Sequence, residues 1–207
     1  DALWGIHTLR ARENFAISGT LLSACPDLIR ALCLVKAAAA RANGELGLLA
    51  PAKVEAILAA CAEIAAGAHH EHFVVDVIQG GAGTSTNMNA NEVIANLALR
   101  QMGRLPGEYS VLHPIEDVNA SQSTNDVYPT ALRVAACFGI ERLLAAMALL
   151  RESFERKAEE FADVLKMGRT QLQDAVPMTL GQEFSTYAVM LGEDEERLRE
   201  AALLIRE

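Results

Sequence analysis

Residues 140–161, IERLLAAMALLRESFERKAEEF, carry the pattern that decides the fold class. Their large apolar residues follow one another at alternating steps of three and four positions, which places them on one face of a helix. A second seam of this kind lies near the end of the chain. The two seams consist of Ile140, Leu143, Met147, Leu150, Phe154 and Phe161, and of Leu180, Phe184, Tyr187, Leu191, Leu198 and Ile205. Seams of this length are typical of long helices that pack against other helices, so the sequence predicts a helical bundle.

Three shorter helices are expected before the first seam. Residues 27–43 and 51–67 are rich in alanine and apolar-periodic, and they are bounded by proline, asparagine or glycine. A third helix is expected from about Ser85 to Gln101. Together with the seams, these stretches predict a mainly α fold.

Strand-like runs are few, and a change of pattern suggests where domains divide. Only residues 72–77, HFVVDV, and 108–112, EYSVL, read as short strands. The polar, turn-rich passage that follows the third helix gives way to the long seam near Pro129. We therefore expect a small N-terminal helical domain over residues 1–125, followed over residues 126–207 by the first long helices of a central helical-bundle domain.

The bundle domain is expected to be truncated. The chain starts at Asp1 rather than methionine, and its last helix keeps its periodicity to Glu207 without a glycine or proline stop. Two bundle helices cannot close a core alone, so we expect further helices, other subunits, or both.

Composition excludes several classes of protein. The 207 residues carry a formal net charge of −9, which argues against a nucleic-acid groove. The four cysteines have no zinc-site spacing and read as free thiols of a reducing compartment. No signal peptide or apolar run long enough to span a bilayer occurs. We therefore expect a cytoplasmic protein without membrane or nucleic-acid partners.

Residues 80–93, GGAGTSTNMNANEV, hold three glycines, three hydroxyl side chains and three asparagines within fourteen positions. The stretch is not a Walker loop, because no lysine follows the glycines, and it lacks the third glycine of a dinucleotide-binding turn. A nucleophile elbow would need glycine where Asn87 stands. The stretch therefore points to hydrogen bonding rather than to these motifs.

Two further stretches have the same donor-rich character. Residues 113–130 contain the run Ser121 to Asp126, and residues 168–183 place Thr170, Gln171 and Gln173 before a helix expected to start at Pro177. Helix starts expose unpaired N–H groups and attract anions. A single such stretch is more often an ordinary helix cap. Three of them together predict a neutral, donor-rich pocket that suits carboxylates.

At these stretches the chain resembles the aspartase/fumarase superfamily. The resemblance rests on GGAGTSTNMNANEVIANLA (80–98), VNASQSTNDVYPTALRVA (118–135) and KMGRTQLQDAVPMTLGQE (166–183), and on the opening DALWGIHTLRARENFAISG. It covers essentially the whole chain in the family's order. It implies a homotetramer in which the three motif regions, from three different subunits, meet in one site.

The resemblance also implies which residues bind the substrate, a small dicarboxylate such as L-aspartate or fumarate. The substrate's β-carboxylate and amino group would be held by Thr84, Ser123, Thr124 and Asn125, and its α-carboxylate end by Thr170 and Gln171. In this family a base takes the C3 proton, an aci-carboxylate forms and ammonia leaves. Preorganised neutral donors would stabilise the charge that develops on the β-carboxylate.

Two short sequences separate branches of the superfamily. STND at 123–126 and TQLQ at 170–173 resemble the ammonia-lyases that act on aspartate, whereas class II fumarases more often read SSND and THLQ. The implied activity is a carbon–nitrogen lyase that converts L-aspartate reversibly to fumarate by anti elimination. Two alternatives stay open: hydration of fumarate to malate, and a non-catalytic helical assembly module of the same fold.

The family's catalytic base has no counterpart here. That base is a serine on a mobile loop, followed by a lysine and an asparagine, and the chain has no GSSxMPxK-like run. We therefore expect substrate-binding residues but no catalytic base in this chain, and no activity from the chain alone. No cofactor is implied.

One group of possible metal ligands stands outside these motifs. His69, His70, Glu71 and His72 are adjacent in sequence. Neighbouring positions of a helix point in different directions, so the group reads as a solvated helix end. No metal site is predicted.

Overall fold

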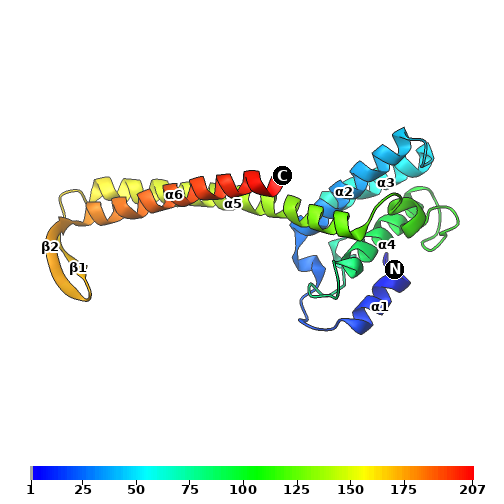
Figure 1. Ribbon diagram of the computed structural model, residues 1–207, viewed down its shortest axis with the longest axis horizontal. Coiled ribbons are helices and arrows are strands. Elements are labelled where there is room, and N and C mark those ends of the chain that lie inside the picture. The colour runs from blue at the N-terminus through cyan, green and yellow to red at the C-terminus, as the bar shows by residue number, and fades with distance from the viewer. Residues whose placement is uncertain (1) are drawn as a thin grey trace. The chain divides into compact units, whose positions relative to one another are not determined.

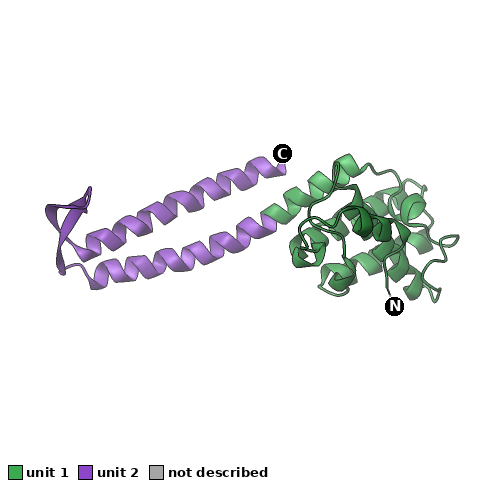
Figure 2. Cartoon of the chain, turned by 90° about the horizontal axis from the view of Figure 1, so that it is seen from below, with its two compact units in different colours: residues 1–136 green, residues 137–207 purple. Residues whose placement is uncertain are grey.

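The computed structural model describes residues 2–207 and confirms the mainly α class (Figure 1). The chain divides into two compact units, residues 1–136 and 137–207 (Figure 2). This division falls inside the helix α5 (Thr124–Glu160), whereas the expected domain boundary at residue 125 falls at that helix's start. The domain boundary itself remains a prediction.

The first unit is built around one buried helix, α4. Its main helices are α1 (Ile6–Asn14), α2 (Pro26–Glu45), α3 (Pro51–Ala65) and α4 (Thr84–Gln101), with short turns η1 (Leu22–Ala24), η2 (His70–His72) and η3 (Pro114–Val118). Helices α1, α2, α3 and η3 all pack against α4, which is buried along nearly its whole length. The donor-rich stretch at 80–93 therefore opens the central helix of this unit.

Two neighbouring helices begin as the sequence predicted. Both α2 and α3 start with a proline in the first turn, where the missing N–H costs no helical hydrogen bond. The buried face of α2 carries apolar side chains at helical spacing, and Lys36 lies on the same face. A buried lysine on an apolar face needs a polar partner, which for Lys36 is Asn119.

The two predicted strands are wrong. Residues 108–112 form turns, and residues 72–77 form no strand: His72 ends η2, and the rest makes a single bridge, between Leu21 and Asp76. The Asp76 carboxylate instead accepts hydrogen bonds from the backbone N–H groups of Ser18, Gly19 and Ile78. Those bonds hold the pKa of Asp76 well below its usual range, with the Ile78 N–H the largest contributor. The stretch still pairs with residues 20–23, since the Val75 carbonyl accepts from the Leu22 N–H at 2.9 Å and the Val77 N–H donates to the Thr20 carbonyl at 3.0 Å, but this pairing is too short to form a strand.

The second unit is a pair of long helices joined by a β-hairpin. The C-terminal part of α5 runs antiparallel to α6 (Leu180–Arg206), and strands β1 (Leu165–Thr170) and β2 (Gln173–Thr179) connect them (Figures 1 and 2). An aromatic cluster joins the helices: Phe154 of α5 and Phe161, directly after α5, lie with ring centroids 5.4–5.8 Å from those of Phe184 and Tyr187 of α6. Residues of both predicted seams therefore meet in this contact.

Helix α6 starts at a position that its sequence specifies. Thr179 caps it through Gln182 in a reciprocal capping box. A side chain at Gly181 would lie 2.4 Å from the carbonyl oxygen of Ala158, so only glycine lets α6 approach α5 here. The helix expected to begin at Pro177 therefore begins later, because Pro177 lies in β2.

None of the helices over residues 2–207 is both long enough and apolar enough to cross a bilayer.

Candidate functional site

The glycines of the first donor-rich stretch are required by its shape. Gly83 has φ +85°, a left-handed conformation, and a Cβ there would lie 2.3 Å from the ring of Tyr128. Gln79 reaches across this turn and its side-chain oxygen accepts from the backbone N–H of Thr86, 2.8 Å away. Thr84, the first residue of α4, is exposed beside them. The turn thus presents one hydroxyl at a helix start while its own backbone is fixed.

Gly83→Ala is expected to destabilise the first unit more than Gly81→Ala does. Both glycines have positive φ, but a Cβ on Gly81 meets nothing within 4 Å. The left-handed conformation costs an alanine about 1–2 kcal/mol at either position, and only Gly83 adds the clash with Tyr128. Urea unfolding followed by tryptophan fluorescence measures both. Equal losses would contradict this account of the turn.

The second donor-rich stretch starts the helix α5. The Ser123 hydroxyl accepts from the Asn125 backbone N–H at 3.2 Å, and its carbonyl accepts from Val127 at 3.0 Å, so Ser123 is an N-cap. The capping interpretation is thus correct for this residue, which is nevertheless exposed. Pro129 lies within the helix and has no N–H to offer the Asn125 carbonyl.

The structure brings the starts of α4 and α5 together. Asn87, one turn after Thr84, donates to the Thr124 hydroxyl at 2.9 Å. The Tyr128 ring, one turn after Thr124, covers Gly83. Two helix N-termini, each carrying hydroxyl side chains, are therefore neighbours in the first unit. Four of the six predicted substrate-binding residues lie at or beside these two helix starts: Thr84, Ser123, Thr124 and Asn125.

Two of the three asparagines of the first stretch, Asn87 and Asn91, belong to a buried hydrogen-bond network that the sequence did not reveal. The Asn119 side-chain oxygen accepts from Lys36 at 2.7 Å, from Asn87 at 3.0 Å and from Asn91 at 3.2 Å. Asn119 in turn donates to the carbonyl of Gln122, the residue before Ser123. The network therefore links α2, α4 and the loop that leads into α5.

Lys36 is the one charged member of this network. It is fully buried, and burial lowers its pKa to about 7, partly offset by the thiols of Cys61 and Cys33. The sequence feature that could have indicated the burial of Lys36 is its position on the apolar face of α2, in line with Ile29, Cys33 and Ala40. Lys36 positions Asn119, and through it the start of α5.

We expect the stabilising effect of Lys36, relative to Lys36→Met, to grow as pH rises from about 7 to about 10. Between these values the folded chain holds Lys36 largely neutral, whereas the unfolded chain keeps it charged up to its ordinary pKa of about 10.4. The unfolded state then binds more protons, so stability rises with pH. Urea unfolding of both proteins at several pH values measures the difference. A constant difference would contradict the expectation.

The third donor-rich stretch lies in the second unit, at a hairpin turn rather than at a helix start. Thr170 ends β1, and the turn consists of Gln171 and Leu172, with φ +51° and +63°. Two-residue hairpin turns of this type favour Asn-Gly, because both residues are left-handed. Non-glycine residues held in this region cost about 1–3 kcal/mol each and are concentrated at functional sites. Both side chains of the turn are exposed.

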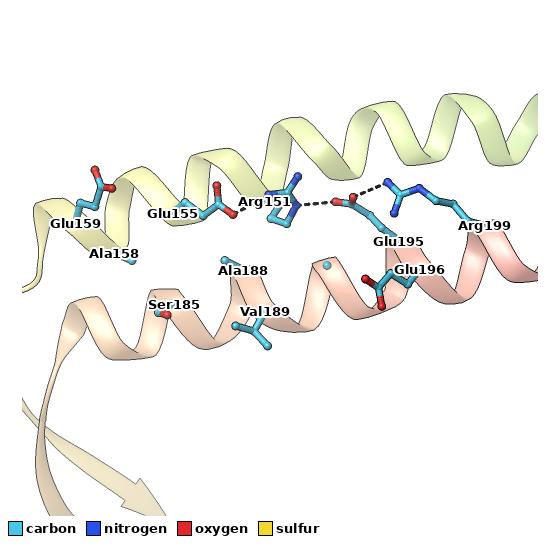
Figure 3. Close-up of a pocket in the computed structure, with 11 residues that line it drawn as sticks. Arg151, Glu155, Ala158, Glu159, Ser185, Ala188, Val189, Glu195, Glu196 and Arg199 are labelled. Atoms are coloured by element: carbon cyan, nitrogen blue, oxygen red, sulfur yellow. Dashed lines mark hydrogen bonds and ion pairs between the residues drawn. The ribbon is translucent and has the colours of Figure 1, made fainter.

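A groove of about 640 Å³ lies between α5 and α6 within the second unit (Figure 3). Glu195 is buried in it and pairs with Arg199 at 2.9 Å and with Arg151 at 3.0 Å, which together lower its pKa. Its other lining residues include the small Ala158, Ser185 and Ala188 and the acidic Glu159 and Glu196. The groove therefore carries more carboxylates than arginines, which does not suit a dicarboxylate substrate.

Comparisons with known proteins agree with these motifs. The family described as "Lyase" matches residues 1–206. An aspartate ammonia-lyase from Pseudomonas aeruginosa is 61% identical over 202 residues, covering 98% of this chain and 43% of that protein. A crystal structure of "fumarate lyase:delta crystallin" from Brucella melitensis is 57% identical with a TM-score of 0.98, covering 100% of this chain and 47% of that one.

A more distant structure gives the same fold. The class II fumarase from Schistosoma mansoni is 32% identical with a TM-score of 0.90, covering 99% of this chain and 43% of that one. The chain thus spans less than half the length of the relatives it matches. By its motifs, its fold and these matches, the chain belongs to the lyase family, within the aspartase/fumarase superfamily.

Proposed function

We propose that the protein containing this chain is an aspartate ammonia-lyase, which eliminates ammonia reversibly from L-aspartate to give fumarate. The observation that carries the proposal is the pair of helix starts that present hydroxyl side chains, Thr84 of α4 and Ser123 before α5, joined through Asn87 and Thr124. The similarity to an aspartate ammonia-lyase at 61% identity supports the choice of substrate.

The two helix starts suit the charge that develops in this elimination. When the C3 proton leaves, negative charge moves onto the β-carboxylate, and the C–N bond then breaks with ammonia taking the electron pair. Hydroxyl donors from Thr84, Ser123 and Thr124 would bind that carboxylate, and the positive ends of α4 and α5 would add to the attraction. Neutral donors also leave the substrate's ammonium group without a competing cation.

Gln171 supports ammonia rather than water as the group that is removed. A histidine at this position could exchange a proton near neutral pH and so assist water chemistry. Glutamine stays neutral and offers only a fixed donor and acceptor. Ammonia departs already protonated from the substrate, so its release needs orientation more than acid catalysis. Gln171 and Asn125 would supply that orientation.

We further propose that the site is shared between subunits of a homotetramer. Leu172 is fully exposed beside Gln171, and both helices of the second unit carry large exposed apolar side chains, such as Leu149 at 67% and Leu204 at 69%. Exposed apolar surface of this extent favours burial against further helices. Assembly would place the hairpin turn of one subunit against the helix starts of another.

The substrate proposal is tested in the full-length protein with L-aspartate, D-aspartate and L-malate, following fumarate by its ultraviolet absorbance. L-aspartate should be consumed and the other two should not. Gln171→Gly should slow turnover roughly tenfold through loss of one hydrogen bond, while it relieves rather than strains the left-handed turn. Leu172→Gly makes the same backbone change and should keep most activity. Faster turnover of malate than aspartate would assign the protein to the fumarases.

Shared sites are tested by mixing two impaired variants. Ser123→Asp and Gln171→Ala proteins are unfolded together, refolded in equal amounts and assayed with L-aspartate. If one site draws these residues from different subunits, some sites in the mixture carry neither change, and activity should exceed the mean of the two variants refolded separately. No recovery, with tetramers of both chains present, would contradict the proposed sharing.

A further inference from the structure

The histidines after α3 do not continue that helix. Gly67 and His69 both have positive φ, +107° and +64°, and the chain then makes the short turn η2 (His70–His72). The expectation of a solvated helix end assumed helical spacing, in which neighbouring side chains diverge. Because His69 adopts a left-handed conformation, the residues that follow it do not have helical spacing, and their side chains need not diverge.

The turn gathers three side chains that can ligate a metal. One ligand atom from each of His69, Glu71 and His72 lies within 4.8 Å of the other two. The Glu71 Oε1 and the His72 Nε2 are 3.6 Å apart. Ligands bonded at about 2.0–2.2 Å to one ion lie roughly 3–4 Å from each other, so small side-chain rotations would bring all three onto one ion. Glu71 is largely exposed and free to make that adjustment.

A second carboxylate holds His69 in place. The Glu63 Oε1 lies 2.7 Å from the His69 Nε2, and the Glu63 Oε2 accepts from Gln101 at 2.9 Å. A carboxylate on one ring nitrogen is the usual support of a metal-binding histidine, because it fixes the ring and leaves the other nitrogen for the ion. The His69 and His72 rings are stacked, with centroids 6.1 Å apart.

The intervening histidine is not part of this cluster. The His70 Nε2 contacts the backbone carbonyl of Ile64 at 2.9 Å, and its ring stands edge-on to Phe73. His70 is therefore the matched control: it has the same side chain, adjacent in sequence, in the same turn.

We propose that His69, Glu71 and His72 bind one divalent transition-metal ion, with Glu63 as the positioning residue for His69 and water completing the coordination. Two imidazoles and a carboxylate suit zinc, cobalt or nickel ions, whereas magnesium and calcium favour oxygen ligands alone. The site lies on the loop that follows α3 and shares no residue with the proposed substrate-binding helix starts.

Cobalt(II) is the probe, because its visible spectrum reports coordination directly. The full 207-residue chain is treated with chelator, its thiols are alkylated so that Cys25 and Cys137 cannot bind metal, and CoCl₂ is titrated in. One ion should bind per chain. His69→Ala and His72→Ala should each weaken binding by tenfold or more, Glu63→Gln by about tenfold, and His70→Ala by less than twofold.

Two measurements separate binding from folding. Glu71→Gln changes an exposed side chain and should weaken binding without altering the urea midpoint of the metal-free chain. Excess MgCl₂ should not displace the cobalt ion. The proposal is overturned if no ion binds in a one-to-one ratio, or if His70→Ala weakens binding as much as His72→Ala.

Discussion

Replacing Ser123 by aspartate in the full-length protein is expected to abolish aspartate turnover while leaving the fold intact. Aspartate is as good an N-cap as serine, so it still accepts from the Asn125 backbone N–H. It cannot donate a hydrogen bond at neutral pH, and its charge repels the substrate carboxylate. Ser123 is exposed, so the larger side chain meets no packed core.

Ser123→Ala completes the comparison. Alanine removes both functions of the hydroxyl: stability should fall by about 1 kcal/mol through the lost cap, and kcat should fall by about 10²–10³ through the lost donor. Ser110→Ala, an exposed serine of the same unit, should change neither quantity. Steady-state kinetics and urea unfolding are measured on all three variants. If Ser123→Asp retains turnover, Ser123 is only a cap.

The largest effect on stability is expected at Glu92, a residue of α4 with 1% of its surface exposed. Its carboxylate accepts from the backbone N–H groups of Gly5 at 2.8 Å, His7 at 2.9 Å and Thr8 at 3.1 Å, and from the Thr8 hydroxyl at 2.6 Å. Helix α1 has no cap from its own N-cap residue, so Glu92 caps it from another helix.

Glu92→Leu should lower the free energy of unfolding of the first unit by 3 kcal/mol or more. The substitution keeps a large side chain but leaves the buried N–H and hydroxyl of Thr8 without an acceptor, at about 1–3 kcal/mol each, and also removes the acceptor of the half-buried N–H groups of Gly5 and His7. Glu92→Gln keeps one accepting oxygen and should cost less. Urea unfolding is followed by the fluorescence of Trp4, the only tryptophan, which precedes α1. Glu13→Gln changes an exposed side chain and should have little effect on the free energy of unfolding. If Glu13→Gln lowered it as much as Glu92→Leu, the loss could not be assigned to the cap of α1.

The helices could be predicted because their signals are local. Prolines at 26 and 51 and long apolar seams set the positions of α2, α3, α5 and α6 to within a few residues. The hairpin at 165–179 could not, because its strands are largely exposed and carry no apolar alternation, and its turn is Gln-Leu rather than Asn-Gly. The stretch around Asp76 was wrongly predicted as a strand because its apolar residues are typical of one, whereas its pairing with residues 20–23 amounts to a single bridge and a few hydrogen bonds.

The candidate site was predictable in type rather than in detail. The sequence indicated dense hydrogen-bonding capacity at 80–93, and the family resemblance selected Thr84 from it. It could not separate the exposed Thr84 from the buried Asn87 and Asn91, since burial depends on how loops distant in sequence pack against α4. The pairing of Lys36 with Asn119 joins positions far apart in sequence, and no local pattern encodes it.

The most direct test of the central claim lets ammonia and water compete for one substrate. The full-length protein is incubated with fumarate and an ammonium salt in water, and the products are followed by proton NMR. The account predicts L-aspartate as the product, with malate negligible, since Gln171 and the hydroxyl and amide side chains at the two helix starts orient ammonia and provide no proton exchange for water. Malate as the main product would contradict it.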